Sequence, residues 1–288
     1  MLVIETVAEM REWTVQHGDR PRAAVYTMGA LHDGHLELVR QAKQHVLSHT
    51  GKHPYVIASI FINPIQFNNA DDLANYPRTL AQDLAMLESV GVDVVFVPSI
   101  EQMYPDGMAH SITIEPGELG DVLEGLGRPG HFRGVLTVVN KLFNITQPDF
   151  AIFGEKDYQQ LTLISLMVKE LNLAIEVIGV STVRDPDGLA LSSRNRRLDD
   201  SSRLIAMRIP QALTLVKNDV ARGVPVAESL RRATEFLAET PDIFLHYLVV
   251  TNNELQAAPA HGSARVLIAA EISGIRLLDN LAIEIKGA

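Results

Sequence analysis

The feature that most constrains this chain is a turn motif, Thr27-Met28-Gly29-Ala30-Leu31-His32-Asp33-Gly34-His35, set between two patterned segments. A β-branched and apolar run, residues 23–27, leads into the motif, and an amphipathic run, residues 36–46, follows it. This pattern predicts a strand, a glycine-containing turn and the start of a helix. Two imidazoles, His32 and His35, would then lie in the first helical turn.

The first turn of a helix favours anions, because its N–H groups have no intrahelical partner and the dipole is positive there. Imidazoles at this place add donors for charge on a phosphoryl group. The chain has no GxxxxGK[ST] pattern, so this is not a P-loop. Two other interpretations of the pair are half of a metal site, without a third ligand nearby, and ordinary surface histidines. His-x-Gly-His after a strand resembles the nucleotidylyltransferase superfamily signature, and class I aminoacyl-tRNA synthetases share a related one.

Composition narrows the class of protein. The net charge of −10 disfavours broad nucleic-acid binding, which needs a basic face. The absence of cysteine excludes disulfides, Cys-ligated zinc and Cys nucleophiles, and it fits a cytoplasmic location. No signal peptide is visible at the N-terminus, and no apolar run reaches the roughly 18 residues of a membrane span. We therefore expect a cytoplasmic protein without nucleic-acid or membrane partners.

Buried strands alternate with amphipathic helices over the first 180 residues, which predicts an α/β fold with a doubly wound, Rossmann-like parallel sheet. The strands are predicted at 55–61, 92–97, 150–153 and 174–180, and the helices at 80–89, 132–145 and 158–171. Ligands of such sheets bind outside the carboxyl ends of the strands. The polar clusters that follow strands should therefore converge on one crevice: His32 and His35, Asn63 and Gln66, Gly154 to Asp157, and Arg184.

The pattern changes near residue 184. Helices are predicted at 202–221 and 226–238, followed by strands at 244–250, 265–271 and 276–284. We expect two domains, a Rossmann-like domain over 1–183 and a smaller α+β domain over 184–288, with the hinge near residue 184.

Three further constellations carry chemistry, each with a plainer alternative. Gly154-Glu155-Lys156-Asp157 could bind phosphate at a helix start or could be a capped helix with solvated charges. Ser192-Ser193-Arg194 could grip a triphosphate or could be a polar linker. The amides of Asn63 and Gln66 suit a hydroxy acid, or they could be exposed at a proline turn.

Together these blocks resemble one family, the pantoate–β-alanine ligases. The motifs that carry the resemblance are TMGALHDGHLELV, SIFINPIQF, YPRTLAQDLAML, LEGLGRPGHFRGVLTVVNKLF, PDFAIFGEKDYQQL, TVRDPDGLALSSRN and RLLDN, over residues 1 to 284. The resemblance implies that pantoate attacks the α-phosphorus of ATP, and that the amine of β-alanine then displaces AMP from pantoyl adenylate. It also implies Mg²⁺ with the ATP, a homodimer, and a place in pantothenate biosynthesis and the coenzyme A pathway.

The resemblance also implies residue roles. The implied catalytic residues are His35 (the proton donor), His32, Lys156 and Arg194. The implied ATP-binding residues are Met28, Gly29, Ala30, Leu31, His32, Asp33, Gly34, His35, Gly154, Glu155, Lys156, Asp157, Val183, Leu191, Ser192, Ser193 and Arg194. Gln66 and Gln160 would hold pantoate, and Asn63, Tyr76, Glu124 and Arg128 would line the substrate site. Asp83 matches a magnesium-associated carboxylate. The chain departs from the usual family pattern at Tyr26, Ser165, Pro186, Leu191 and His246.

Three other functions compete with this one. They are a different nucleotidylyltransferase, a non-catalytic ATP-binding regulator and a tRNA synthetase fragment. The acidic charge and the lack of an anticodon domain disfavour the last. Pyrophosphate exchange into ATP that requires pantoate would separate the ligase from the first.

Overall fold

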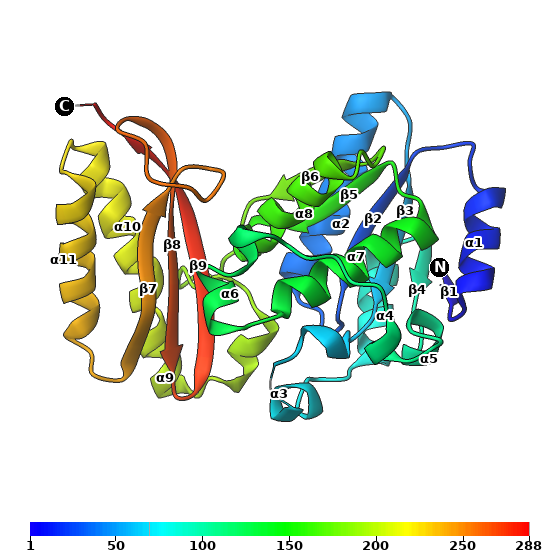
Figure 1. Ribbon diagram of the computed structural model, residues 1–288, viewed down its shortest axis with the longest axis horizontal. Helices are drawn as coiled ribbons and strands as arrows, with labels where there is room; N and C mark the ends of the chain where they lie inside the picture. Colours follow the sequence, from blue (N-terminus) through cyan, green and yellow to red (C-terminus); the bar gives the residue numbers. More distant parts are fainter. Residues whose placement is uncertain (69, 288) are drawn as a thin grey trace. The chain divides into compact units, whose positions relative to one another are not determined.

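The chain up to Val180 builds a parallel sheet in the computed structural model, which describes residues 1–68 and 70–287. Its strands, in spatial order, are β1 (Leu2–Ile4), β4 (Val94–Phe96), β3 (Tyr55–Ile60), β2 (Arg22–Thr27), β5 (Phe150–Gly154) and β6 (Glu176–Val180). All neighbours run parallel. The predicted doubly wound α/β fold is confirmed (Figure 1).

Alternate residues of each strand face opposite layers of helices. Ala23 and Val25 face one core with α2 (Asp33–Thr50) and α4 (Leu80–Ser89). Tyr26 points the other way, toward α7 (His131–Thr146), where its hydroxyl lies 2.7 Å from Thr146 Oγ1. Burial raises the pKa of this phenol. The other α-helices described up to Val180 are α1 (Val7–Gln16), α3 (Ala70–Ala74), α5 (Ile100–Met103), α6 (Glu124–Gly127) and α8 (Tyr158–Glu170).

The strand order reverses at β2. The chain proceeds from β2 to β3 and β4 on one side, whereas β5 and β6 extend the sheet on the other. The carboxyl ends of β2 and β5 therefore flank the topological switch point, where ligands of open α/β sheets bind. The histidine motif follows β2, and Gly154-Glu155 follows β5. The sheet topology thus brings two of the predicted clusters to the same edge.

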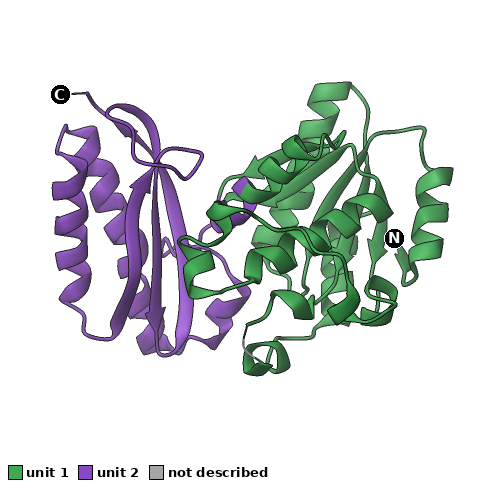
Figure 2. Cartoon of the chain, viewed as in Figure 1, with its two compact units in different colours: residues 1–155, 163–181 green, residues 156–162, 182–288 purple. Residues whose placement is uncertain are grey.

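The chain forms two compact units, coloured in Figure 2: residues 1–155 with 163–181, and residues 156–162 with the chain from 182 onward. The second unit has an antiparallel sheet, β7 (Ile243–Thr251), β8 (Gly262–Ile272) and β9 (Ile275–Ile285). Its helices are α9 (Asp200–Ala206), α10 (Arg208–Ala221) and α11 (Val226–Ala238). They pack on this sheet through one apolar cluster. Ala288, the last residue of the predicted α+β domain, lies outside the described residues.

The helix predicted over 202–221 is wrong as one element, because α9 ends at Ala206 and α10 begins at Arg208. Pro210 lies in the first turn of α10, where its missing N–H is tolerated, so a new helix begins there.

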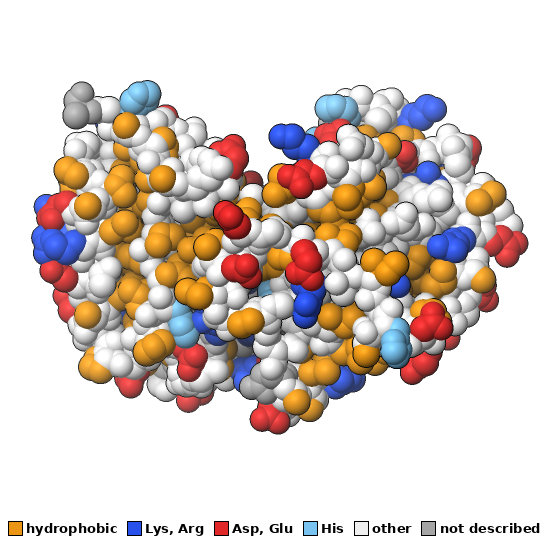
Figure 3. Space-filling view, in the orientation of Figure 1, with side chains coloured by type: hydrophobic (Ala, Val, Ile, Leu, Met, Phe, Trp, Pro, Cys, Tyr) orange, Lys and Arg blue, Asp and Glu red, His pale blue; other side chains and the backbone are white. Residues whose placement is uncertain are grey.

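Within the described ranges, no helix has the length and apolarity needed to cross a bilayer. Acidic and basic side chains are interspersed over the face that Figure 3 shows.

Candidate active site

The turn after β2 has an unusual backbone. Gly29 and Ala30 both have positive φ, 80° and 51°. Thr27 ties the turn to the sheet, because its Oγ1 accepts from the amide of Gly29 at 3.2 Å and donates to the carbonyl of Ser59 at 2.8 Å. The tight turn delivers the chain directly from the end of β2 into the first turn of α2.

A buried carboxylate holds this turn from behind. Asp83 of α4 is 1% exposed. Its Oδ2 accepts from the amide of Ala30 at 3.0 Å, and its Oδ1 accepts from the amide of Leu31 at 2.8 Å. Thr79 Oγ1 donates to both oxygens at 3.1 Å. The amides of Ala30 and Leu31 therefore point at Asp83, so any contact of these two residues with ATP involves other atoms.

Two histidines cap α2. His32 is the N-cap residue, and its Nδ1 accepts from the amide of Gly34 at 3.2 Å. His35 Nδ1 accepts in turn from the amide of His32 at 3.3 Å, which completes a capping box. The two rings lie 4.1 Å apart. Because Nδ1 accepts in each ring, the proton of the neutral imidazole lies on Nε2, a donor suited to a phosphate oxygen.

The two predicted amides after β3 are brought together. Asn63 Nδ2 donates to Gln66 Oε1 at 3.2 Å, and Gln66 Nε2 contacts Met28 Sδ at 3.1 Å. Asn63 is fixed from the other side by Tyr104, whose hydroxyl donates to its Oδ1 at 2.8 Å. Burial raises the pKa of Tyr104 to about 12. These contacts fix the side chain of Asn63, and Asn63 in turn positions Gln66 beside the turn that follows β2.

The start of α7 packs on the backbone of Gln66. His131 Nδ1 lies 2.9 Å from the carbonyl oxygen of Gln66, and Arg128 Nη1 lies 3.1 Å from His131 Nε2. The carbonyl of Gly134 accepts from Asn63 Nδ2 at 3.1 Å. A Cβ on Gly134 would lie 2.8 Å from the Gln66 backbone, so only glycine fits without movement.

The predicted lining residues have varied surroundings. Tyr76 is buried, with its ring edge-on to Phe67 at 5.6 Å. Glu124 is buried at the start of α6. Asp33, predicted to contact ATP, is exposed in the first turn of α2. Arg128 lies close to Gln66, the residue predicted to bind pantoate, because its Nη2 is 3.5 Å from the carbonyl oxygen of Gln66.

The remaining cluster after β5 divides between the units. Gly154 ends β5, and Glu155 follows it in the first unit. Lys156, Asp157 and Gln160 belong to the second unit. The ammonium of Lys156 lies 3.4 Å from Asp157 Oδ1, and its carbonyl accepts from Asn280 Nδ2 at 3.0 Å. Lys156 is thereby attached to β9.

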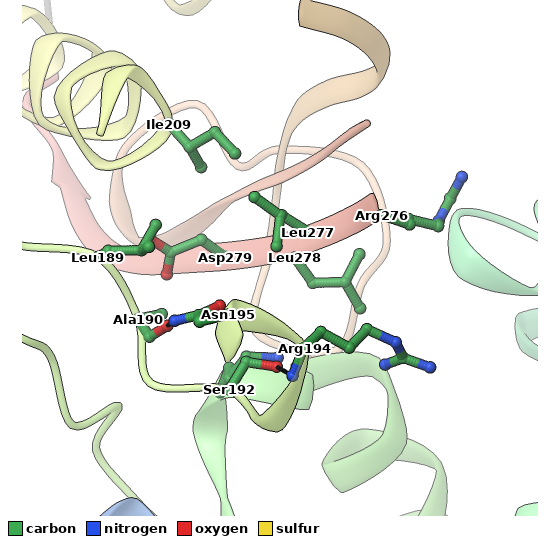
Figure 4. A pocket seen from close by; sticks show the side chains of 11 residues that line it. Leu189, Ala190, Ser192, Arg194, Asn195, Ile209, Arg276, Leu277, Leu278 and Asp279 are labelled. Carbon is green, nitrogen blue, oxygen red and sulfur yellow. Dashed lines mark hydrogen bonds between the residues drawn. The ribbon is translucent and has the colours of Figure 1, made fainter. Parts of the chain in front are cut away.

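Lys156 lines a pocket of the second unit together with Ser192 and Arg194. Figure 4 shows Ser192 and Arg194 in this pocket. The amide of Arg194 donates to Ser192 Oγ at 3.3 Å, and the amide of Leu191 donates to the carbonyl of Val183 at 2.9 Å. Ser193 begins the short 3₁₀ turn that contains Arg194. The pocket thus unites three of the predicted phosphate ligands.

Four residues of β9 also line that pocket, and two of them, Arg276 and Asp279, are charged. Asp279 is paired with the Arg184 guanidinium through two bonds of 2.7 and 2.8 Å, which balances its charge. Arg276 is a third cation of the lining, and sequence reasoning noted it only inside the RLLDN motif. The departure at Pro186 lies in a turn that Arg203 holds through Asp185 and Asp187.

A metal ion fits poorly at Asp83. Each carboxylate oxygen already accepts from one backbone amide and from the Thr79 hydroxyl. Across residues 1–68 and 70–287, no group of three or more acidic or histidine side chains could hold a metal ion. The described residues therefore form no site that could hold magnesium with protein ligands alone. Magnesium commonly binds one or two protein carboxylates together with substrate phosphates.

The parallel sheet, with a histidine-capped helix start at its switch point, defines a nucleotide-binding α/β protein. The chain belongs to the pantoate–β-alanine ligase family, whose model matches residues 2–282.

Named relatives agree with this family. The pantothenate synthetase of Mycolicibacterium smegmatis is 51% identical over 261 residues, 91% of this chain and 80% of that relative. The synthetase of Mycobacterium avium is 48% identical over 94% of this chain and 85% of its own length. The crystal structure of the Thermus thermophilus synthetase superposes with a TM-score of 0.89 at 42% identity, covering 98% of this chain and 99% of that one.

The pantoate–β-alanine ligase of Francisella tularensis, complexed with beta-gamma ATP and β-alanine, gives a TM-score of 0.79 at 36% identity. It covers 98% of this chain and 97% of that one.

Proposed function

We propose that this protein forms pantothenate from pantoate, β-alanine and ATP. A pantoate carboxylate oxygen attacks the α-phosphorus of ATP, so that pyrophosphate leaves and pantoyl adenylate forms. The amine of β-alanine then attacks the acyl carbon, and AMP leaves. The observation that carries this proposal is the pair of Nδ1-anchored histidines capping α2 in a member of the ligase family.

His32 and His35 act on the phosphates in this proposal. Their Nε2–H groups donate to oxygens on which charge develops, and His35 is the proton donor. No covalent intermediate with the enzyme forms, so positioning and electrostatics provide the rate enhancement. Gln66 holds pantoate and lies near β-alanine, while Asn63 orients Gln66 through its 3.2 Å bond. Gln160 is the second pantoate ligand.

Lys156 and Arg194 bind ATP phosphates together with Ser192 and Ser193. A guanidinium can grip two phosphate oxygens at once, whereas an ammonium acts as a point charge. The same proposal retains the other residues predicted to contact ATP: Met28, Gly29, Ala30, Leu31, Asp33, Gly34, Gly154, Glu155, Asp157, Val183 and Leu191. Tyr76, Glu124 and Arg128 line the substrate site.

Four finer features belong to the same proposal. Mg²⁺ accompanies the ATP phosphates, and no reaction step is assigned to it. Residues 1–183 hold ATP and pantoate, and residues 184–288 act as a lid. The protein is a cytoplasmic homodimer. Sedimentation of the full chain tests the dimer, and fractionation of cells tests the location.

The test is AMP release from ATP, pantoate and β-alanine, with each substrate omitted in turn. His35→Ala and Lys156→Ala should each lower the adenylation rate by roughly 10²–10³, the cost of one transition-state donor. His45→Ala and Lys169→Ala are matched controls on α2 and α8 and should keep the rate.

Loss of the capping contact in His35→Ala should cost about 0.5–2 kcal/mol of stability, so unfolding is measured alongside the rate. A His35→Ala or Lys156→Ala enzyme with the wild-type adenylation rate would remove that residue from the mechanism. Release of AMP without pantoate would refute the proposed reaction.

A further inference from the structure

The turn between β2 and α2 needs an external constraint to keep its shape. Gly29 and Ala30 are consecutive residues with positive φ. Glycine adopts this conformation readily, but Ala30 has a Cβ that makes it unfavourable. The turn also sets the position of His32, the N-cap residue of α2. Something outside the turn must therefore hold it.

Asp83 and Thr79 supply that constraint. The carboxylate of Asp83 receives one amide of the turn on each oxygen, from Ala30 and Leu31. Thr79 is the N-cap residue of α4 but makes no side-chain capping bond, and its hydroxyl is directed to Asp83 instead. Hydrogen bonds to a buried carboxylate are stronger than those between neutral groups.

Gly29 of the turn packs closely against Asp83. A Cβ on Gly29 would lie 3.0 Å from Asp83 Oδ2 and 3.2 Å from Ile60 Cγ2. A cation beside this carboxylate would stand against the two amide protons that now face it. The amides could not turn away without changing the backbone of the turn, so the site favours a structural contact over a metal ion.

We propose that Asp83 and Thr79 are positioning residues, which fix the turn so that His32 and His35 meet the nucleotide in the correct place, and that Asp83 is not a magnesium ligand. This inference rests on the proposed function and assigns these two residues a part in it.

The experiment compares Asp83→Asn and Thr79→Val with two controls. Thr79→Ser keeps the hydroxyl. Asp93→Asn alters another carboxylate that holds a backbone amide, because Asp93 Oδ2 accepts from Val56 at 2.7 Å, away from the turn. For each variant we measure kcat, KM for ATP and for pantoate, the half-saturating Mg²⁺ concentration, urea unfolding, ATP affinity by calorimetry, and hydrogen exchange of the turn amides.

Asp83→Asn and Thr79→Val should lower kcat/KM for ATP by roughly 10–100-fold, the value of a hydrogen bond to a charged group. KM for pantoate and half-saturating Mg²⁺ should stay unchanged, while the amides of Ala30 and Leu31 exchange faster. Thr79→Ser should behave as wild type. Asp93→Asn should lose stability but keep kcat/KM for ATP.

With an active wild-type enzyme, two outcomes overturn the inference. One is a raised half-saturating Mg²⁺ in Asp83→Asn with kcat restored by excess Mg²⁺, which would make Asp83 a metal ligand. The other is an equal loss of kcat/KM for ATP in Asp83→Asn and Asp93→Asn at equal loss of stability. If Asp83→Asn does not fold, Thr79→Val decides in the same way.

A wild-type protein that releases no AMP would refute the proposed function instead. In that event faster exchange of the turn amides together with weaker ATP binding in calorimetry still supports the positioning role. Unchanged ATP affinity overturns it.

Discussion

Replacing Gly134 by alanine sets two opposed effects against each other. In an open helical position the change stabilises a protein by about 1 kcal/mol. Here the new methyl would lie 2.8 Å from both the nitrogen and the Cα of Gln66 and 2.9 Å from the carbonyl carbon of Ile65. Overpacking of this kind costs about 1–3 kcal/mol. The net change in unfolding free energy is therefore a loss of about 0–2 kcal/mol.

Substrate binding separates the two effects better than stability does. The atoms that the new methyl would meet belong to the backbone of Ile65 and Gln66. No change of side-chain rotamer can relieve this contact, so the 65–66 segment must move away from α7. Gln66 would then lie displaced from its place beside Met28 and Asn63. We expect KM for pantoate to rise about tenfold or more, as a misplaced binding group does. The affinity for ATP should stay unchanged.

The assay is the pantoate dependence of AMP release together with urea unfolding. Gly18→Ala is the control, because a Cβ there would meet nothing within 4 Å. The reasoning is refuted if Gly134→Ala gains the full helical stabilisation and keeps the wild-type KM for pantoate.

Substitutions at three further residues test separate parts of the site. Gln160→Ala should weaken pantoate binding by about 1–3 kcal/mol and leave ATP binding unchanged, as calorimetry would show; equal losses for both ligands would contradict the assignment. Arg194→Ala should lower the affinity for ATP and the adenylation rate, and Arg194→Lys should restore only part of the activity. Wild-type activity in Arg194→Lys would exclude a guanidinium that binds two phosphate oxygens at once. Bound ATP should also slow proteolysis near Arg194. Tyr104→Phe should be less stable than wild type at pH 8, because Asn63 Oδ1 loses a donor. The pKa of Tyr104 is raised to about 12, so above pH 10 the unfolded chain ionises first and wild type loses this advantage. Chemical denaturation between pH 8 and 12 should show the deficit narrowing; a constant deficit would refute the burial argument.

Strong periodic patterns predicted the elements well. The helix at 80–89 and the helix at 226–238 were predicted with the bounds of α4 and α11. By contrast, β1 and α1 were not predicted. β1 has only three residues, of which Ile4 alone is buried. α1 buries Met10, Trp13 and Thr14 among many polar residues, so its apolar face is too sparse to stand out.

The site shows a different limit. Motifs indicated the side chains suited to ATP and pantoate, because their chemistry is visible in the residue types. Sequence reasoning assigned no role to Thr79, Tyr104, His131 and Gly134, which act on the backbone or side chains of other site residues. Tyr104 is 41 positions from Asn63, and His131 is 65 positions from Gln66. Contacts across such separations follow from the fold and leave no local pattern.

The two-part composition of the second unit has a consequence for synthesis of the chain. Its short segment, 156–162, is translated well before β9, yet Asn280 of β9 bonds to the carbonyl of Lys156 across 124 positions. Tyr158, in the same segment, covers the guanidinium of Arg265 at 3.6 Å. Such distant pairings form late, because loop closure precedes the contacts that reward it. While the ribosome makes residues 163 to 264, the 156–162 segment has neither of these two partners.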